Sequence, residues 1–247
     1  MSIQPVTADS LGLLATDEPP VFRIENGTSE RPLLIVCDHA GNYMPRALAN
    51  LGLEAHHLDQ HIAWDLGAAQ VARRLGALLD SRVICSSYSR LVVDVNRHPC
   101  DVGAIPPLSD GILVPGNLGL SPQLRQQRFE SLFDPYHEAI AATLSTLTRG
   151  AVFPALVSIH SCTPFMHGVF RPWELGILWD KDPRIAVPLM ASLRQHSGME
   201  IGDNLPYSGM HPADYTMDVH GEAAGLAHVA IEIRQDLIAA EDGQVRM

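Results

Sequence analysis

The chain has 247 residues, of which 46% are hydrophobic and 18% charged, and its formal net charge is −11. This composition is typical of a globular protein rather than a disordered one, and the length suits a single α/β domain with a sizeable core. The negative charge and the lack of a Lys/Arg cluster argue against nucleic acid as a partner, because binding to phosphates needs a basic patch.

The cysteines and the N-terminus restrict the cellular setting. The four cysteines show no CxxC and no regular spacing, which predicts neither a disulfide framework nor a zinc knuckle. The N-terminus has no charged start followed by an apolar block, and no stretch approaches the roughly 20 apolar residues of a membrane span. We therefore expect a cytoplasmic enzyme or binding protein without membrane association.

The chain is predicted to divide into an N-terminal arm, residues 1–31, and an α/β domain, residues 32–247. The arm is rich in Pro, Thr, Asp and Glu, and a short strand is expected at residues 21–24. The domain opens with the apolar run of residues 33–37, which is typical of a strand buried on both faces of a parallel sheet.

Two such strands end in a histidine. The run of residues 33–37 leads into Asp38 and His39, and residues 155–161 contain His160. The carboxyl ends of parallel strands are where open α/β sheets place their sites. His39 and His160 are therefore a candidate pair of metal ligands, although each imidazole could simply satisfy local backbone groups.

The remaining segments alternate between helix and strand. Apolar spacing and turn residues predict helices at 58–79, 121–149 and 183–196 and strands at 82–86, 91–95, 174–179 and 229–233. Residues 98–120 are dense in Pro and Gly, which predicts a long loop that is either functional or mobile. The alternation predicts a mostly parallel or mixed sheet covered by helices on both faces.

A metal centre needs a third ligand. Zinc hydrolases use three protein groups from His, Asp and Glu and leave one position for water. Asp59 opens the helix that follows the first histidine strand, and His61 and Asp65 are the neighbouring alternatives. A carboxylate at that position could equally well interact with the helix dipole alone.

A hydrolase also needs a general base, for which Glu232 is the leading candidate. It lies between two isoleucines in the apolar strand 229–233, where a charge is costly unless it is paired or functional. The alternative is a structural ion pair with Arg234 or another arginine.

Asn96 and Arg97 lie together after residues 91–95, and an arginine beside an amide is suited to bind a carboxylate. Arg171 and Arg90 could add positive charge. Ser161 or Cys162 could act as a nucleophile, but neither lies in a recognisable nucleophile motif, and no nucleotide-binding loop is present.

Six segments together resemble the N-formylglutamate amidohydrolase family: CDHAGNYMP, DQHIAWDLGA, SRLVVDVNR, SIHSCTP, RPWELGILWD and HVAIEIRQDLI. The resemblance runs from about residue 33 to residue 238, and it rests on the order and joint presence of the segments. It implies a fold related to the zinc carboxypeptidases. It also implies a Zn²⁺-dependent hydrolase that converts a small-molecule N-acyl amino acid, such as N-formyl-L-glutamate, to the amino acid and formate or another small acid.

The resemblance also implies roles for residues. His39 and His160 would bind zinc, Asn96 and Arg97 would hold the α-carboxylate of the substrate, and Glu232 would be general base and then acid. The carboxypeptidase pattern HxxE has Asn42 at its fourth position here, so the carboxylate ligand is assigned to Asp59. Arg171 is assigned to the side-chain carboxylate of a glutamate substrate.

Two other functions stay open on the sequence. A binding protein could keep the pocket with an incomplete metal site, as Asn42 suggests, and a metal-independent hydrolase could use Cys162 or Ser161. The sequence does not indicate the oligomeric state.

Overall fold

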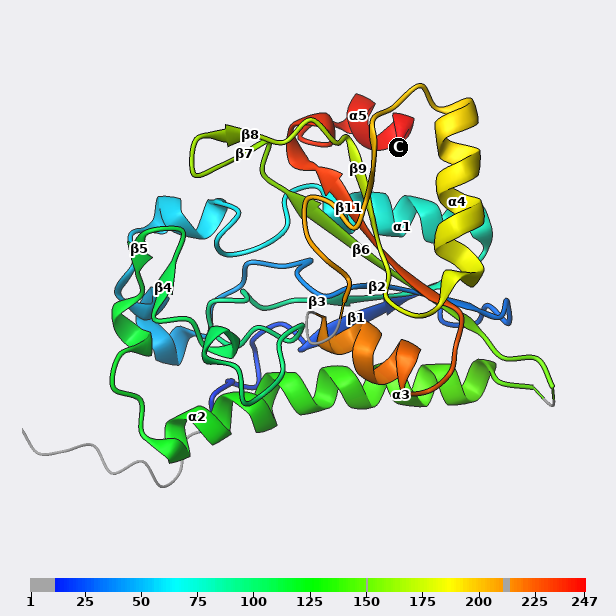
Figure 1. Cartoon of the computed structure of the whole chain (residues 1–247). Helices are drawn as coiled ribbons and strands as arrows, with labels where there is room; N and C mark the ends of the chain where they lie inside the picture. Colours follow the sequence, from blue (N-terminus) through cyan, green and yellow to red (C-terminus); the bar gives the residue numbers. More distant parts are fainter. Residues whose placement is uncertain (1–11, 150, 211–213) are drawn as a thin grey trace, which may run out of the picture.

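The central element is a mixed sheet of seven strands. The computed structural model describes residues 12–149, 151–210 and 214–247. The strand order is β1-β3-β2-β6-β11-β9-β10, and Figure 1 shows helices on both sides of this sheet. The strands are β1 (Phe22–Glu25), β2 (Leu33–Cys37), β3 (Arg82–Ser86), β6 (Ala155–Cys162), β9 (Leu175–Leu178), β10 (Ile201–Asp203) and β11 (His228–Arg234).

The inner strands β3, β2, β6 and β11 run parallel to one another, while β1 is antiparallel to β3, and β9 is antiparallel to β11. The predicted architecture of a mixed sheet between helices is therefore confirmed. The expected strand near residues 21–24 is β1 at the edge of the sheet.

Alternating residues of the inner strands build two cores. In β2, Leu34 and Val36 belong to one apolar cluster, and Ile35 and Cys37 belong to the other. The first cluster includes α3 (Asp134–Leu147), which continues from α2 (Pro122–Arg128) through the π-helical η5 (Phe129–Phe133). The second is covered by α1 (Ala68–Leu79) and α4 (Pro183–His196), with α5 (Glu241–Arg246) beside α1.

Two predicted elements differ from the structure. The predicted helix 58–79 begins only at Ala68, because Gly67 before it is left-handed with a φ of 79°. Its first part is instead the 3₁₀ helix η2 (Ala55–Asp59) followed by turns. The predicted strand 91–95 consists of turns and irregular chain.

Two short hairpins were not predicted. The Pro/Gly-rich segment 98–120 holds η3 (Val102–Ala104), the hairpin β4 (Leu108–Ser109) and β5 (Ile112–Leu113), and η4 (Pro115–Asn117). A second hairpin pairs β7 (Phe165–Met166) with β8 (Val169–Phe170). Each turns through two residues of positive φ, Asp110–Gly111 and His167–Gly168, the geometry of tight two-residue hairpins.

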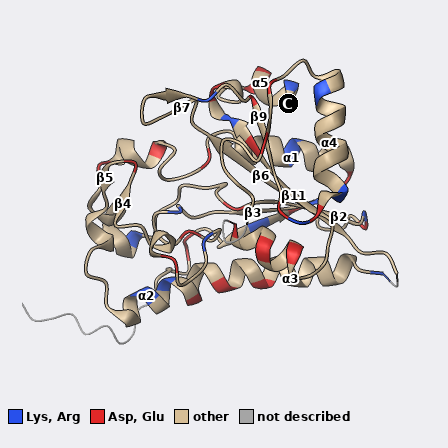
Figure 2. Ribbon diagram, in the orientation of Figure 1, with Lys and Arg blue, Asp and Glu red and all other residues tan. Residues whose placement is uncertain are grey.

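The shorter helical segments are η1 (Arg46–Gly52), η6 (Met217–Glu222) and η7 (Gln235–Leu237). Charged positions are distributed over many elements in Figure 2. Among the described residues, none of the helices combines the length and apolarity needed to cross a bilayer.

Candidate metal centre and active site

Two histidines meet at the carboxyl end of the parallel strands. β2 and β6 are adjacent, and His39 follows the end of β2, whereas His160 lies within β6. Both side chains are buried, and their ring centroids are 5.1 Å apart. The structure thus brings together two residues that are 121 positions apart in the sequence.

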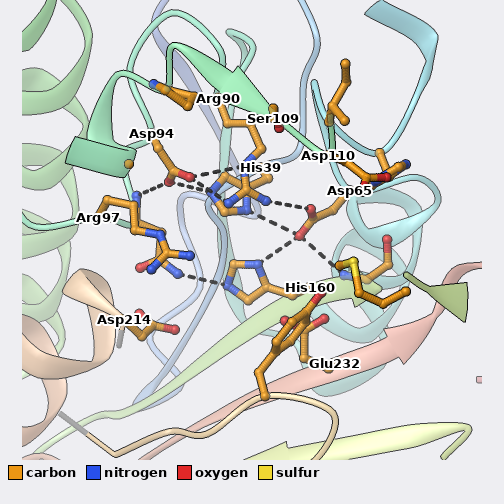
Figure 3. A pocket seen from close by; sticks show the side chains of 18 of the residues that line it. His39, Asp65, Arg90, Asp94, Arg97, Ser109, Asp110, His160, Asp214 and Glu232 are labelled. Atoms are coloured by element: carbon orange, nitrogen blue, oxygen red, sulfur yellow. Dashed lines mark hydrogen bonds and ion pairs between the residues drawn. The ribbon is translucent and has the colours of Figure 1, made fainter. Parts of the chain in front are cut away.

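Asp65 is the third member of this group. Its Oδ2 lies 2.9 Å from His160 Nδ1 and 3.4 Å from His39 Nδ1. Its backbone N–H donates to the carbonyl of His39, which ties this turn to the strand end. One ligand atom from each of the three buried side chains lies within 4.8 Å of the others, and Figure 3 shows the three side chains pointing toward one another.

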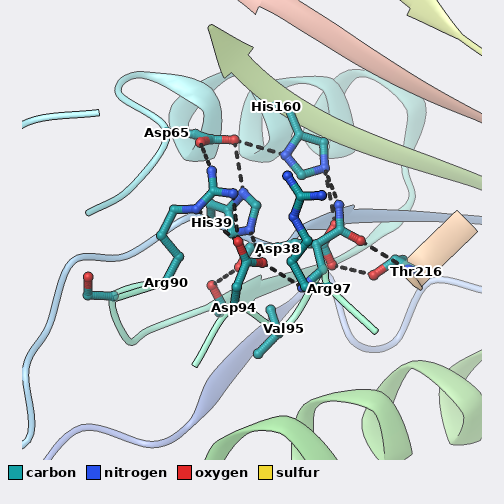
Figure 4. A network of polar contacts seen from close by, with 12 residues as sticks. Asp38, His39, Asp65, Arg90, Asp94, Val95, Arg97, His160 and Thr216 are labelled. Carbon is teal, nitrogen blue, oxygen red and sulfur yellow. Dashed lines mark hydrogen bonds and ion pairs between the residues drawn. The ribbon is translucent and has the colours of Figure 1, made fainter. Parts of the chain in front are cut away.

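A second set of carboxylates orients the two imidazoles. His39 Nε2 lies 2.8 Å from Asp94 Oδ1, and His160 Nε2 lies 3.2 Å from Asp38 Oδ2 and 2.9 Å from Ser158 Oγ (Figure 4). In the metal-free protein both ring nitrogens of each histidine therefore face a carboxylate. With a metal at Nδ1, the proton on each Nε2 would be held by Asp94 or Asp38.

The supporting carboxylates are themselves fixed. Tyr136 and Thr216 donate to Asp38 Oδ1 over 3.0 and 2.7 Å. Burial alone would raise the pKa of Asp94, but the positive charges of Arg90 and His39 outweigh it and hold that pKa below its usual value. Asp94 therefore remains an anion that can accept from His39.

The donor set fits a divalent zinc ion. Two imidazole nitrogens and one carboxylate oxygen are three of the ligands that catalytic zinc sites use, and the carboxylate–histidine contacts are the support that such ligands need. His39, Asp65 and His160 are the residues that would hold the ion.

Glu232 stands beside this group. It pairs with His160 in the register between β11 and β6, and it lines the same pocket. Its Oε2 is buried without a hydrogen-bond partner. Burial raises the pKa of Glu232 to about 7 despite the opposing charge of His160. Arg234 bonds instead to Asp236, so the expected alternative of an ion pair with Arg234 is not formed.

The pocket above the site has a volume of about 690 Å³. Asn96, Arg97 and Arg90 line it, as do both hairpin turns through Asp110 and His167. Asn96 Nδ2 is 3.4 Å from His160 Nε2, which places the amide next to the candidate metal ligands.

Two predicted site residues lie apart from the pocket. Asp59 ends η2 with an exposed side chain, and it does not line the pocket; the chain returns to the strand ends only at Asp65. The structure thus places Asp65, one of the alternatives from the sequence, and not Asp59 beside the two histidines. Arg171 is buried behind the pocket wall, where its Nη1 donates to Tyr207 Oη over 2.9 Å.

Of the two candidate nucleophiles, the Ser161 hydroxyl is hydrogen-bonded and Cys162 is kept as a thiol. Ser161 Oγ donates to the carbonyl of Leu66. Burial raises the pKa of the Cys162 thiol to about 12, which disfavours its thiolate.

Four residues of the site were not among the candidates from the sequence. Asp38, Asp94 and Ser158 contact the two histidines, and Asp214 lines the pocket. Asp38 adjoins His39 and Asp94 lies two positions before Asn96, so an acidic residue next to a candidate ligand was the available signal.

The family model for N-formylglutamate amidohydrolase matches residues 31–239. This match, with the sheet and the site, defines a hydrolase that acts on an amide C–N bond. The chain belongs to the N-formylglutamate amidohydrolase family.

Two solved structures are similar to this one. Gene product Atu2144 from Agrobacterium tumefaciens has 35% sequence identity and a TM-score of 0.90, and the match covers 94% of this chain and 92% of that one. N-formylglutamate amidohydrolase from Ralstonia eutropha JMP134 has 17% identity and a TM-score of 0.66, with 91% and 89% coverage, and this second likeness concerns the fold alone. No curated protein matches the chain.

Proposed function

We propose that this protein is a zinc-dependent amidohydrolase that cleaves an N-acyl amino acid, N-formyl-L-glutamate or a related compound, to the free amino acid and formate or another small acid. The observation that carries the proposal is the buried group of His39, Asp65 and His160 with the unpartnered carboxyl of Glu232 beside it. Family membership supports the amide bond as the target.

His39, Asp65 and His160 would hold the ion. When bound, zinc would supply a Lewis acid for the acyl carbonyl and lower the pKa of a coordinated water. The Nε2–H groups of the two histidines would stay committed to Asp94 and Asp38, which fixes the imidazole orientations throughout turnover.

Glu232 would move the proton. Burial raises the pKa of Glu232 to about 7 in the metal-free protein, and the charge of a nearby zinc ion would lower it, so that the carboxylate would accept the proton of a water at neutral pH. It would take the proton of the attacking water and return it to the leaving nitrogen. Its free Oε2 requires no other contact to be broken.

Asn96 and Arg97 would bind the α-carboxylate. Both line the pocket, and the amide next to His160 would bring the scissile bond close to the candidate ligands. Arg90 bonds to Asp94 Oδ2 over 2.6 and 3.0 Å and faces the same pocket, where it would add positive charge near the acyl oxygen.

Metal analysis with formate release is the test. The purified protein is expected to contain about one zinc per chain, to release formate from an N-formyl amino acid, to lose this activity on chelation and to regain it with zinc. Activity that survives complete removal of metal would reject the proposal. Bound zinc without turnover of any N-acyl amino acid would indicate a binding protein instead.

A further inference from the structure

A buried arginine without a carboxylate partner lies directly behind the pocket wall. Arg171 is only 8% exposed. Its Nη1 donates to Tyr207 Oη over 2.9 Å and contacts the carbonyl and Oγ1 of Thr163 over 3.4 Å. Among the described residues, none of the polar contacts of this guanidinium is with a carboxylate. Because a buried cation is costly unless it is paired or functional, Arg171 indicates that an anion is bound nearby.

Tyr207 connects this charge to the substrate space. The guanidinium stacks 4.6 Å from the centroid of the Tyr207 ring, and Tyr207 lines the pocket whereas Arg171 does not. The phenol oxygen accepts from Arg171, and no described residue accepts the phenol's own proton. Burial, and then the charge of Glu232, raise the pKa of Tyr207 above its usual value, so the phenol keeps this proton at neutral pH. Tyr207 therefore has an unused donor, which the cation behind it strengthens.

The strand order places this donor apart from the residues proposed to bind the α-carboxylate. Asn96 and Arg97 belong to the chain that follows β3, whereas Arg171 precedes β9 and Tyr207 follows β10. The strands β2 and β6, which lead to the candidate metal ligands, lie between these two parts of the sheet. With the α-carboxylate at Asn96 and Arg97 and the acyl group at the metal ligands, the side chain is the substrate group left for Tyr207.

Other charged groups of the pocket wall are already paired or remain in water. Asp110 lies 3.1 Å from His61, and Arg90 donates to Asp94 over 2.6 Å. His167, in the β7–β8 turn, lines the pocket but is exposed, so that a carboxylate bound there would be screened by solvent. The buried guanidinium behind the phenol is therefore better suited to stabilise a second carboxylate of the substrate.

We propose that Tyr207 determines specificity by donating a hydrogen bond to the side-chain carboxylate of an acidic N-acyl amino acid, and that Arg171 is a positioning residue that acts through Tyr207. The inference rests on the proposed function and deepens it, because it distinguishes N-formyl-L-glutamate from its neutral isostere N-formyl-L-glutamine. Arg171 holds the phenol by the hydrogen bond and the stacked ring, and its charge stabilises the carboxylate from behind. The direct contact between Arg171 and the carboxylate that the sequence suggested is thereby replaced.

The test compares N-formyl-L-glutamate with N-formyl-L-glutamine on the zinc-loaded full chain. Tyr207→Phe keeps the stacked ring and removes the hydroxyl. It should raise KM for the glutamate derivative about fivefold with kcat nearly unchanged, and it should change KM for the glutamine derivative less than about twofold. Tyr88→Phe is the matched control, because it removes a phenol hydroxyl that donates to the Pro19 carbonyl outside the pocket, and it should alter the preference for neither substrate.

Variants of Arg171 test its indirect role. Arg171→Met should also raise KM for the glutamate derivative more than KM for the glutamine derivative. Arg171→Lys keeps the charge and should restore part of this difference. Thermal unfolding of each variant shows whether the fold is retained. An Arg171 that served the fold alone would lower kcat for both substrates alike, without rescue by lysine, and this result would contradict the positioning role.

An equal effect of Tyr207→Phe on both substrates, or a loss confined to kcat, would overturn the inference. Loss of the preference for glutamate in His167→Gln but not in Tyr207→Phe would overturn it as well. If no N-formyl amino acid is hydrolysed, the proposed function has failed, and calorimetric binding of the same two compounds to the purified chain decides the inference separately. Tighter binding of the glutamate derivative that is lost in Tyr207→Phe supports it, whereas equal binding, or binding of neither compound, contradicts it.

Discussion

Replacing Glu232 with glutamine separates a catalytic role from a structural one. Glutamine has the same shape but cannot accept the proton of a water. Loss of a positioned general base lowers turnover by about 10²- to 10⁴-fold, which corresponds to about 3 to 5 kcal/mol of barrier. The zinc content should stay unchanged, because Glu232 is not part of the His39–Asp65–His160 group.

The same substitution should not weaken the fold. Burial raises the pKa of Glu232 from 4.5 to about 7, so the folded chain holds this proton more tightly than the unfolded chain does. The free energy of unfolding therefore falls as pH rises from 4.5 to 7, by about 3 kcal/mol in total. Without zinc, Glu232→Gln should exceed the parent protein in stability at pH 8 by up to this amount, and the gain should disappear near pH 4.

Steady-state formate release, metal analysis and urea unfolding at the two pH values are the assays. Near-normal turnover would remove Glu232 from the role of base. A variant that is less stable than the parent at pH 8 would show that the carboxylate serves a structural ion pair after all, contrary to its unpartnered Oε2.

Three further outcomes follow from other parts of the site and the core. Asp94→Asn should weaken zinc affinity about 10- to 100-fold in competition with a chelating dye, since it removes the acceptor that orients His39; unchanged affinity would contradict this role. Arg97→Gln should raise KM for an N-formyl amino acid about tenfold with little change in kcat, because the substrate carboxylate loses its cation, and a loss confined to kcat would refute this. Burial lowers the pKa of His137 from 6.5 to about 4, so the unfolded chain binds this proton more tightly and stability falls by about 3 kcal/mol as pH drops from 6.5 to 4. In thermal unfolding between pH 7 and 4.5, the stability of His137→Gln should fall less steeply with pH than that of the parent protein. Equal slopes of stability against pH would contradict the lowered pKa of His137.

The strand-end residues could be predicted from the sequence because short-range patterns place them. An apolar run followed by a histidine puts His39 at the carboxyl end of a buried strand, and the same reasoning applies to His160. Parallel neighbours then bring the two residues together without any knowledge of the loops between them. Glu232 could also be predicted from a short-range pattern, because a charged residue within an apolar strand is unusual.

Asp65 could not be selected over Asp59 because its position depends on a non-local return of the chain. The apolar spacing after residue 58 resembled one long helix, whereas Gly67 is left-handed and delays α1 to Ala68. Because Gly67 has no side chain, the backbone can pass close to Ile238. A Cβ at Gly67 would lie 2.4 Å from the Ile238 carbonyl oxygen. The turn carrying Asp65 therefore lies against chain that is 171 positions away from Gly67 in the sequence, which no local pattern reveals.

The zinc content of two matched variants tests the metal centre most directly. Asp65→Asn and Asp59→Asn remove the same charge six residues apart, one inside the buried group and one on the exposed end of η2. Mass spectrometry of dialysed proteins should find about one zinc per chain in the parent and in Asp59→Asn and a large loss in Asp65→Asn. A full zinc content in Asp65→Asn together with loss of zinc in Asp59→Asn would contradict a metal site formed by His39, Asp65 and His160.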